Sequence, residues 1–135
     1  ASKHGECDET TTASVIRKIY SLGVYPDWWK LEPSTNDAAW NAIETAILEN
    51  DTYCRGIVVL GLSAEENALI ESFSAAARCR LVKGFAVGRT IFNGAAKHWL
   101  AGKITDAELK SELMRNFKRL VKGWDAAKQA ARERN

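Results

Sequence analysis

The sequence is poor in the residues that build metal centres and disulfide frameworks. It has three cysteines, an odd number without CxxC spacing, and only two histidines, His4 and His98, which lie far apart along the chain. A disulfide scaffold requires paired cysteines, and a zinc site requires clustered histidines or thiolates. We therefore expect reduced thiols, a cytoplasmic location, no metal and no cofactor.

Long apolar runs and concentrated charge are also missing. No run approaches the roughly 18 apolar residues of a membrane-spanning helix, and no opening segment has the pattern of a secretory signal. The net charge of +2 is too small and too evenly spread for a nucleic-acid surface. The composition therefore argues against membrane and nucleic-acid partners.

What remains is a chain of 135 residues, 46% hydrophobic, which is enough for one globular core. Residues 1–11 are polar and irregular, so we expect one domain over residues 12–135. Apolar residues at helical spacing predict helices from Thr12 to Gly23, from the STND segment to Asn50, and after a capping box of Ser63 and Glu66. They also predict a short helix closed by Gly102 and a long one opened by a second capping box, Thr105 with Glu108.

Three strand candidates alternate with these helices. They lie within YPDWWKLEP (residues 25–33), GIVVLGL (56–62) and LVKGFAVG (81–88), and the second has the continuous β-branched run of a strand buried on both faces. The alternation predicts an α/β fold with a parallel sheet. Three strands leave two bare edges. Helices, strands from a partner chain, or the rest of a longer chain must cover them, and we favour the last two.

The first strand carries two charges among its tryptophans. Side chains alternate across a sheet, so Lys30 and Glu32 share one face near the carboxyl end, where ligands bind in βα units. A lysine amine that the tryptophans shield from water has a lowered pKa and can attack a carbonyl to form an imine. The nearby Glu32 opposes that shift. A structural pair of Lys30 and Glu32 is an equally good interpretation.

Glycines end the other two strands just before a helix. Gly61 and Ser63 follow the second strand, and Gly88 and Arg89 follow the third. Glycine lets backbone amides approach an anion, a helix N-terminus favours negative charge, and arginine can bind phosphate through two donors. These four residues therefore predict a phosphate site.

The motifs DWWKLEP, CRGIVVLGLSAEEN and LVKGFAVGRTIF together resemble a family. They are similar to the C-terminal domain fused to bacterial 5-dehydro-2-deoxygluconokinases of inositol catabolism, which itself is similar to class I, Schiff-base aldolases of the tagatose-bisphosphate type. The resemblance runs from about Val15 to Trp124. It implies that the three strands are the sixth to eighth of a parallel (β/α)8 barrel.

The resemblance also implies roles and a reaction. Lys30 matches the imine-forming lysine of the sixth strand, and Gly61, Gly88 and Arg89 match the phosphate-holding groups of the last two strands. The implied reaction is cleavage of 2-deoxy-5-keto-gluconate 6-phosphate to dihydroxyacetone phosphate and malonate semialdehyde. The kinase portion and the first barrel strands are missing from this sequence, so we expect a fragment that is inactive alone.

Two other interpretations stay open. One is a phosphosugar-binding or regulatory domain without covalent chemistry. The other is a subunit that completes a barrel in a homo-oligomer or within a longer chain.

Overall fold

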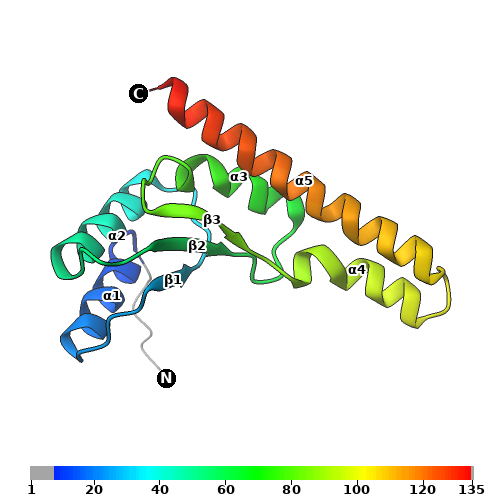
Figure 1. Ribbon diagram of the computed structural model, residues 1–135, viewed down its shortest axis with the longest axis horizontal. Helices are drawn as coiled ribbons and strands as arrows, with labels where there is room; N and C mark the ends of the chain where they lie inside the picture. The colour runs from blue at the N-terminus through cyan, green and yellow to red at the C-terminus, as the bar shows by residue number, and fades with distance from the viewer. Residues whose placement is uncertain (1–7, 135) are drawn as a thin grey trace.

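The computed structural model describes residues 8–134, which form alternating strands and helices (Figure 1). The order confirms the predicted α/β class, and the first helix starts at Thr11, one residue before the expected Thr12. Residues 1–7, most of the segment expected to be irregular, lie outside the described part. The elements are α1 Thr11–Ser21, β1 Trp28–Leu31, α2 Asp37–Asn50, β2 Gly56–Leu60, α3 Glu66–Ala76, β3 Val82–Ala86, α4 Arg89–Leu100 and α5 Asp106–Glu133.

The three strands form one parallel sheet in the order β1-β2-β3. Lys30 pairs in register with Val58, and Val58 with Gly84. An irregularity between Ile57 and Val58 shifts the register of β3 by one residue. The sheet is compatible with part of a barrel, although these strands alone do not close into one.

One face of the sheet carries the core. Trp29 and Leu31 of β1 are buried there with Ile57 and Val59 of β2, because alternate residues of a strand point to the same side. Side chains from the helices pack on this face. They include Ile16 and Tyr20 of α1, Trp40, Ile43 and Ile47 of α2, Leu69 and Phe73 of α3, and Leu120 of α5.

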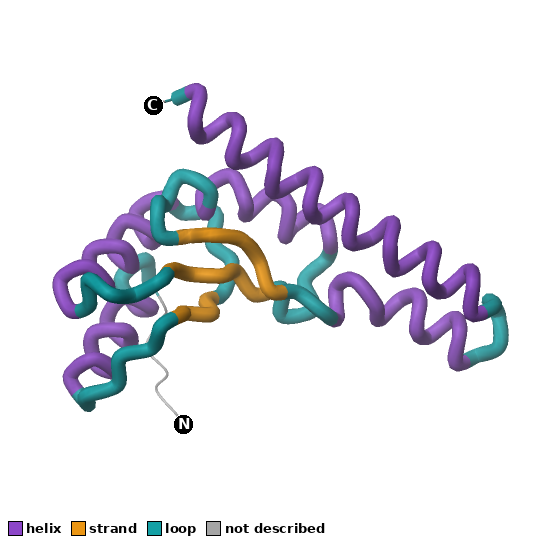
Figure 2. The backbone as a smooth tube through the Cα atoms, viewed as in Figure 1, coloured by secondary structure: helices purple, strands orange, loops and turns teal. Residues whose placement is uncertain are grey.

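The opposite face is open in the described chain. Trp28 is 45% exposed, Lys30 is exposed, and a Cβ added at Gly84 would meet no atom within 4 Å. Val58 and Leu60 are half-buried. The prediction that the GIVVLGL strand is buried on both faces is therefore wrong here, since no helix covers its second face (Figure 2).

Helix starts follow the sequence signals in two cases and depart in one. Asn36 caps α2 by accepting from the backbone N–H of Ala38 at 2.8 Å, and Thr105 with Glu108 forms the predicted capping box of α5. The predicted capping box of Ser63 with Glu66 is wrong. Ser63 has a φ of +63°, whereas a capping residue needs an extended backbone. The first residue of α3 is Glu66, and its N-cap residue, Glu65, makes no side-chain capping bond.

The last two helices, α4 and α5, are joined by a short turn. α4 extends away from the sheet, and α5 returns alongside α4 and continues across α3 (Figure 1). Gly102, with a φ of +67°, turns the chain between α4 and α5 as predicted. Within residues 8–134 no helix combines the length and hydropathy needed to cross a bilayer.

Cys54 and Cys79 are free thiols, as expected for the two cysteines in the described part of the chain. Burial raises the pKa of the Cys79 thiol to about 11, so this side chain stays protonated in the core near neutral pH. Cys54 is half-buried, and burial raises its pKa as well.

Replacing either of two helical glycines, Gly123 or Gly94, by alanine is expected to change the free energy of unfolding in opposite directions. A Cβ at Gly123 of α5 would lie 2.9 Å from Cγ2 of Ile70 on α3, whereas a Cβ at Gly94 of α4 would meet nothing within 4 Å. Gly123→Ala forces the two helices apart and should lower the free energy of unfolding by roughly 1 kcal/mol or more. Gly94→Ala should raise it by about 0.5–1 kcal/mol, because alanine loses less backbone entropy in a helix.

Urea denaturation followed by circular dichroism measures both effects. Equal shifts in the same direction for the two variants would contradict the close packing of α3 against α5.

Candidate functional site

Lys30 lies on the face of β1 that the alternation predicts. Lys30 is on the open face of the sheet, opposite the buried Trp29 and Leu31, and Glu32 is the exposed residue that follows the strand. No ion pair within 4.0 Å joins Lys30 to Glu32, so the structural pair is not formed in the described chain. Both charges reach solvent.

The tryptophans do not shield Lys30 here, contrary to expectation. The indole of Trp29 points into the core, where its Nε1–H donates to the hydroxyl of Tyr20 at 3.0 Å. Trp28 shares the face of Lys30 and is itself half exposed. Desolvation of the Lys30 amine would therefore require further protein that covers the open face of the sheet.

A pocket of 250 Å³ at the carboxyl ends of β2 and β3 brings together the other predicted residues. We name it the strand-end pocket. Gly61 and Ser63 line it from the loop after β2, and Gly88 and Arg89 line it from the loop after β3 and the start of α4. Parallel strands end at the same edge, which is why segments about 25 residues apart in sequence meet here.

The loop after β2 has an unusual backbone. Leu62 and Ser63 both have left-handed conformations, with φ of +50° and +63°. The N–H of Ala64 donates to the carbonyl of Gly61 at 2.8 Å, and the hydroxyl of Thr90 donates to the carbonyl of Ala64 at 3.0 Å. Left-handed non-glycine residues are unfavourable and cluster at functional sites. The bond from Thr90 holds this turn against the start of α4.

Arg89 is the first residue of α4, and its side chain is exposed at the pocket. The N-cap residue is Gly88, which supplies no side-chain acceptor for the first amides of the helix. Among the described residues no carboxylate forms an ion pair with Arg89. The first turn of a helix and a guanidinium without an ion-pair partner form a positive region that favours an anion.

Lys30 and the strand-end pocket share one face of the sheet. Leu60 and Ala86 line the pocket, and they pair with each other one step beyond the row of Lys30, Val58 and Gly84. That step is two residues, about 7 Å along the strands, and β1 lies about 5 Å from β2. A flexible lysine side chain can therefore extend toward a ligand held at the pocket.

A second pocket, of 470 Å³, opens on the other side of Arg89, between the start of α3, α4 and α5. We name it the interhelical pocket. Sequence reasoning missed its residues Asn93, Lys97 and Arg119, although Arg89, Asn93 and Lys97 recur every four residues, the spacing of one helix face. That spacing was the available signal.

Arg119 at this pocket is already engaged. Its guanidinium donates to both carboxylate oxygens of Glu66, and to Oδ1 of Asn116 at 2.7 Å. Hydrogen bonding to Glu66 raises the pKa of Arg119 above its usual value. Asn116 in turn donates to the carbonyl of Ile91 at 2.8 Å, so these contacts connect α3, α4 and α5.

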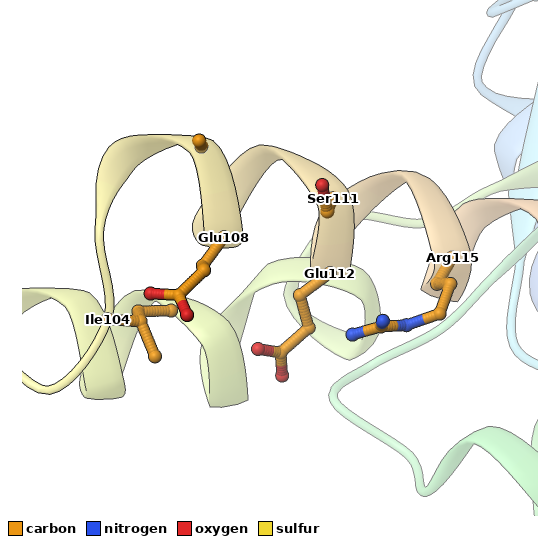
Figure 3. Close-up of a pocket in the computed structure, with 6 residues that line it drawn as sticks. Ile104, Glu108, Ser111, Glu112 and Arg115 are labelled. Carbon is orange, nitrogen blue, oxygen red and sulfur yellow. The ribbon is translucent and has the colours of Figure 1, made fainter.

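A third pocket, of 410 Å³, lies along the beginning of α5 (Figure 3). Ile104 precedes the helix, and Glu108, Glu112 and Arg115 project from it. Every residue that lines it comes from this one segment, so no second element encloses a ligand. It contains none of the predicted site residues, and we assign it no role.

The fold and these pockets define an α/β protein with a candidate anion site at the carboxyl edge of a parallel sheet. Over residues 1–128 the sequence matches the model of a family described as "Uncharacterized protein conserved in bacteria (DUF2090)", and the chain belongs to this family. A search of curated proteins finds no match.

Gly61 has a packing role that can be tested. A Cβ at this position would lie 2.8 Å from Cγ1 of Val87 and 3.1 Å from the hydroxyl oxygen of Thr90. Gly61→Ala should therefore displace the loop after β3 and lower the free energy of unfolding by about 1–3 kcal/mol, the usual cost of overpacking.

The double variant Gly61→Ala with Val87→Ala removes the nearest obstructing methyl groups. It should lose less stability than the sum of the two single changes, as measured by thermal unfolding. Strict additivity would show that Gly61 and Val87 do not constrain each other.

Proposed function

We propose that the chain carries the imine-forming lysine and the phosphate anchor of a class I aldolase-like site. Lys30 is the nucleophile, and the strand-end pocket, through Arg89 and the backbone around Gly61, Ser63 and Gly88, holds the phosphate. The single observation that supports this most is the placement of Lys30 on the same open face as Leu60 and Ala86, which lead into that pocket.

The chemistry follows from the amine. The neutral Nζ of Lys30 adds to a ketone, and loss of water leaves an iminium ion. A base removes the proton of the hydroxyl group β to the ketone carbon. The adjacent carbon–carbon bond breaks, its electron pair moves to the iminium nitrogen, and an aldehyde leaves. Protonation of the resulting enamine and hydrolysis release the second product and restore the amine.

We assign the handling of these protons to Glu32. It follows β1 directly, two residues after Lys30, and its side chain is exposed. We assign Glu32 to orienting Lys30 or carrying protons.

The substrate class comes from the resemblance. A phosphorylated keto sugar acid, 2-deoxy-5-keto-gluconate 6-phosphate, would yield dihydroxyacetone phosphate and malonate semialdehyde. The open sheet face is consistent with the last three strands of an eight-stranded barrel, in which five further strands enclose Lys30. Those strands would come from a longer chain or from a partner copy.

The exposure of Lys30 favours a second candidate, a phosphosugar-binding or regulatory domain. Such a domain uses the strand-end pocket without covalent chemistry. It requires Arg89 and is indifferent to Lys30.

Reductive trapping distinguishes the two. When the protein is incubated with dihydroxyacetone phosphate and borohydride, peptide mapping should show several-fold more label on Lys30 than on Lys83, an exposed lysine of β3. The phosphate held at Arg89 brings the carbonyl to Lys30 and not to Lys83. Arg89→Gln, or an excess of inorganic phosphate, should abolish the preference.

Unphosphorylated dihydroxyacetone is the matched control and should label both lysines equally. Equal labelling with the phosphorylated ketone as well would overturn the aldolase proposal. If phosphate binding is then lost in Arg89→Gln and kept in Lys30→Arg, the binding domain is the correct function.

A further inference from the structure

One side of the interhelical pocket, formed by α4, carries basic and polar side chains. This pocket is the larger of the two pockets that meet at Arg89, and its lining is mostly polar. Arg89, Asn93 and Lys97 form one row along α4, and the row extends over eight residue steps, or about 12 Å along the helix axis. Ser63 and Thr90 add hydroxyl groups at the end nearest the strand-end pocket.

The charged residues that line the interhelical pocket leave a net positive charge. Arg119 and Glu66 neutralise each other through their ion pair. Among the described residues, Arg89 and Lys97 form no ion pair, and the one other carboxylate of the lining is that of Glu65. A net positive, hydrogen-bonding surface therefore remains along α4.

Gly94 is a second, independent indication. It lies inside α4, where glycine costs about 1 kcal/mol relative to alanine, and no neighbour comes within 4 Å of the Cβ that alanine would add. Packing does not require a glycine here, in contrast to Gly123 in α5. Gly94 lines the interhelical pocket, so no side chain enters the pocket from this position.

We propose that the interhelical pocket binds a linear oligophosphate group, a diphosphate or triphosphate, laid along α4 from Arg89 to Lys97. A single phosphate engages one end of the row, whereas an oligophosphate presents several anionic groups along it, each able to accept from Arg89, Asn93 or Lys97. The site is distinct from the imine chemistry at Lys30, and it does not depend on that chemistry.

Arg89 lines both the interhelical pocket and the strand-end pocket, so a ligand bound in one affects binding in the other. The same guanidinium cannot hold an oligophosphate along α4 and a phosphate ester in the strand-end pocket with full strength. An oligophosphate bound along α4 would therefore compete with a phosphorylated ligand of the strand-end pocket, a consequence that, unlike the binding itself, rests on the proposed function.

Calorimetric titration of the protein with tripolyphosphate and with orthophosphate tests the proposal. Tripolyphosphate should bind at least tenfold more tightly than orthophosphate, and its affinity should fall with added salt. Lys97→Gln should weaken tripolyphosphate binding about tenfold and leave orthophosphate binding unchanged. Lys97→Arg, which keeps the charge, should restore most of the affinity.

Three further variants act as controls. Lys118→Gln removes an equal charge from an exposed position of α5 outside this pocket and should have no effect. Glu65→Gln removes the opposing carboxylate and should tighten binding. Gly94→Met fills the pocket and should abolish it while circular dichroism confirms the helix.

Equal weakening by Lys97→Gln and Lys118→Gln would show non-specific attraction and overturn the proposal. Equal affinity for tripolyphosphate and orthophosphate would do the same. Neither result bears on the trapping of a ketone at Lys30, so failure here and failure of the aldolase proposal are separate outcomes.

Discussion

Burial of a single face of the sheet is the constraint on which the rest of this structure depends. Ile57 and Val59 are completely buried against helices, while Val58 and Leu60, their neighbours on the same strand, remain half-exposed. The apolar face fixes the register of the strands, because a shift by one residue would move every side chain to the wrong side. Lys30 is thereby assigned to the open face and Trp29 to the core.

The core also positions the helices that form the pockets. The ring of Phe73 on α3 lies 5.3 Å from that of Phe85 on β3 and 5.5 Å from that of Trp124 on α5, measured between centroids. Phe117 of α5 extends this row at 6.3 Å from Phe85. Since α5 packs in turn against α4, the aromatic row sets where Arg119 meets Glu66 and where the interhelical pocket opens.

The sequence predicts the order of elements well and their environment less well. Periodicity locates all three strands and places Gly61, Ser63, Gly88 and Arg89 at strand ends, and the structure gathers these four around one pocket. Periodicity reports only local spacing, so it could not show that the second face of β2 lies open. It also could not show that Ser63 turns left-handed, because that conformation is fixed by contacts of the loop with the start of α4. Asn93, Lys97 and Arg119 were missed because their meeting depends on how α4 and α5 pack.

The two outer strands of the sheet, β1 and β3, have backbone edges that can pair with a further strand. Among residues 8–134, β1 and β3 each pair with a strand on one side only, so the outer edge of each presents backbone donors and acceptors. An extended segment that pairs with such an edge gains backbone hydrogen bonds, and this pairing does not require a particular sequence. At high concentration the nearest such segment is a copy of the same strand. The outer margins of β1 and β3 are therefore the places where an added strand, whatever its source, would gain backbone hydrogen bonds.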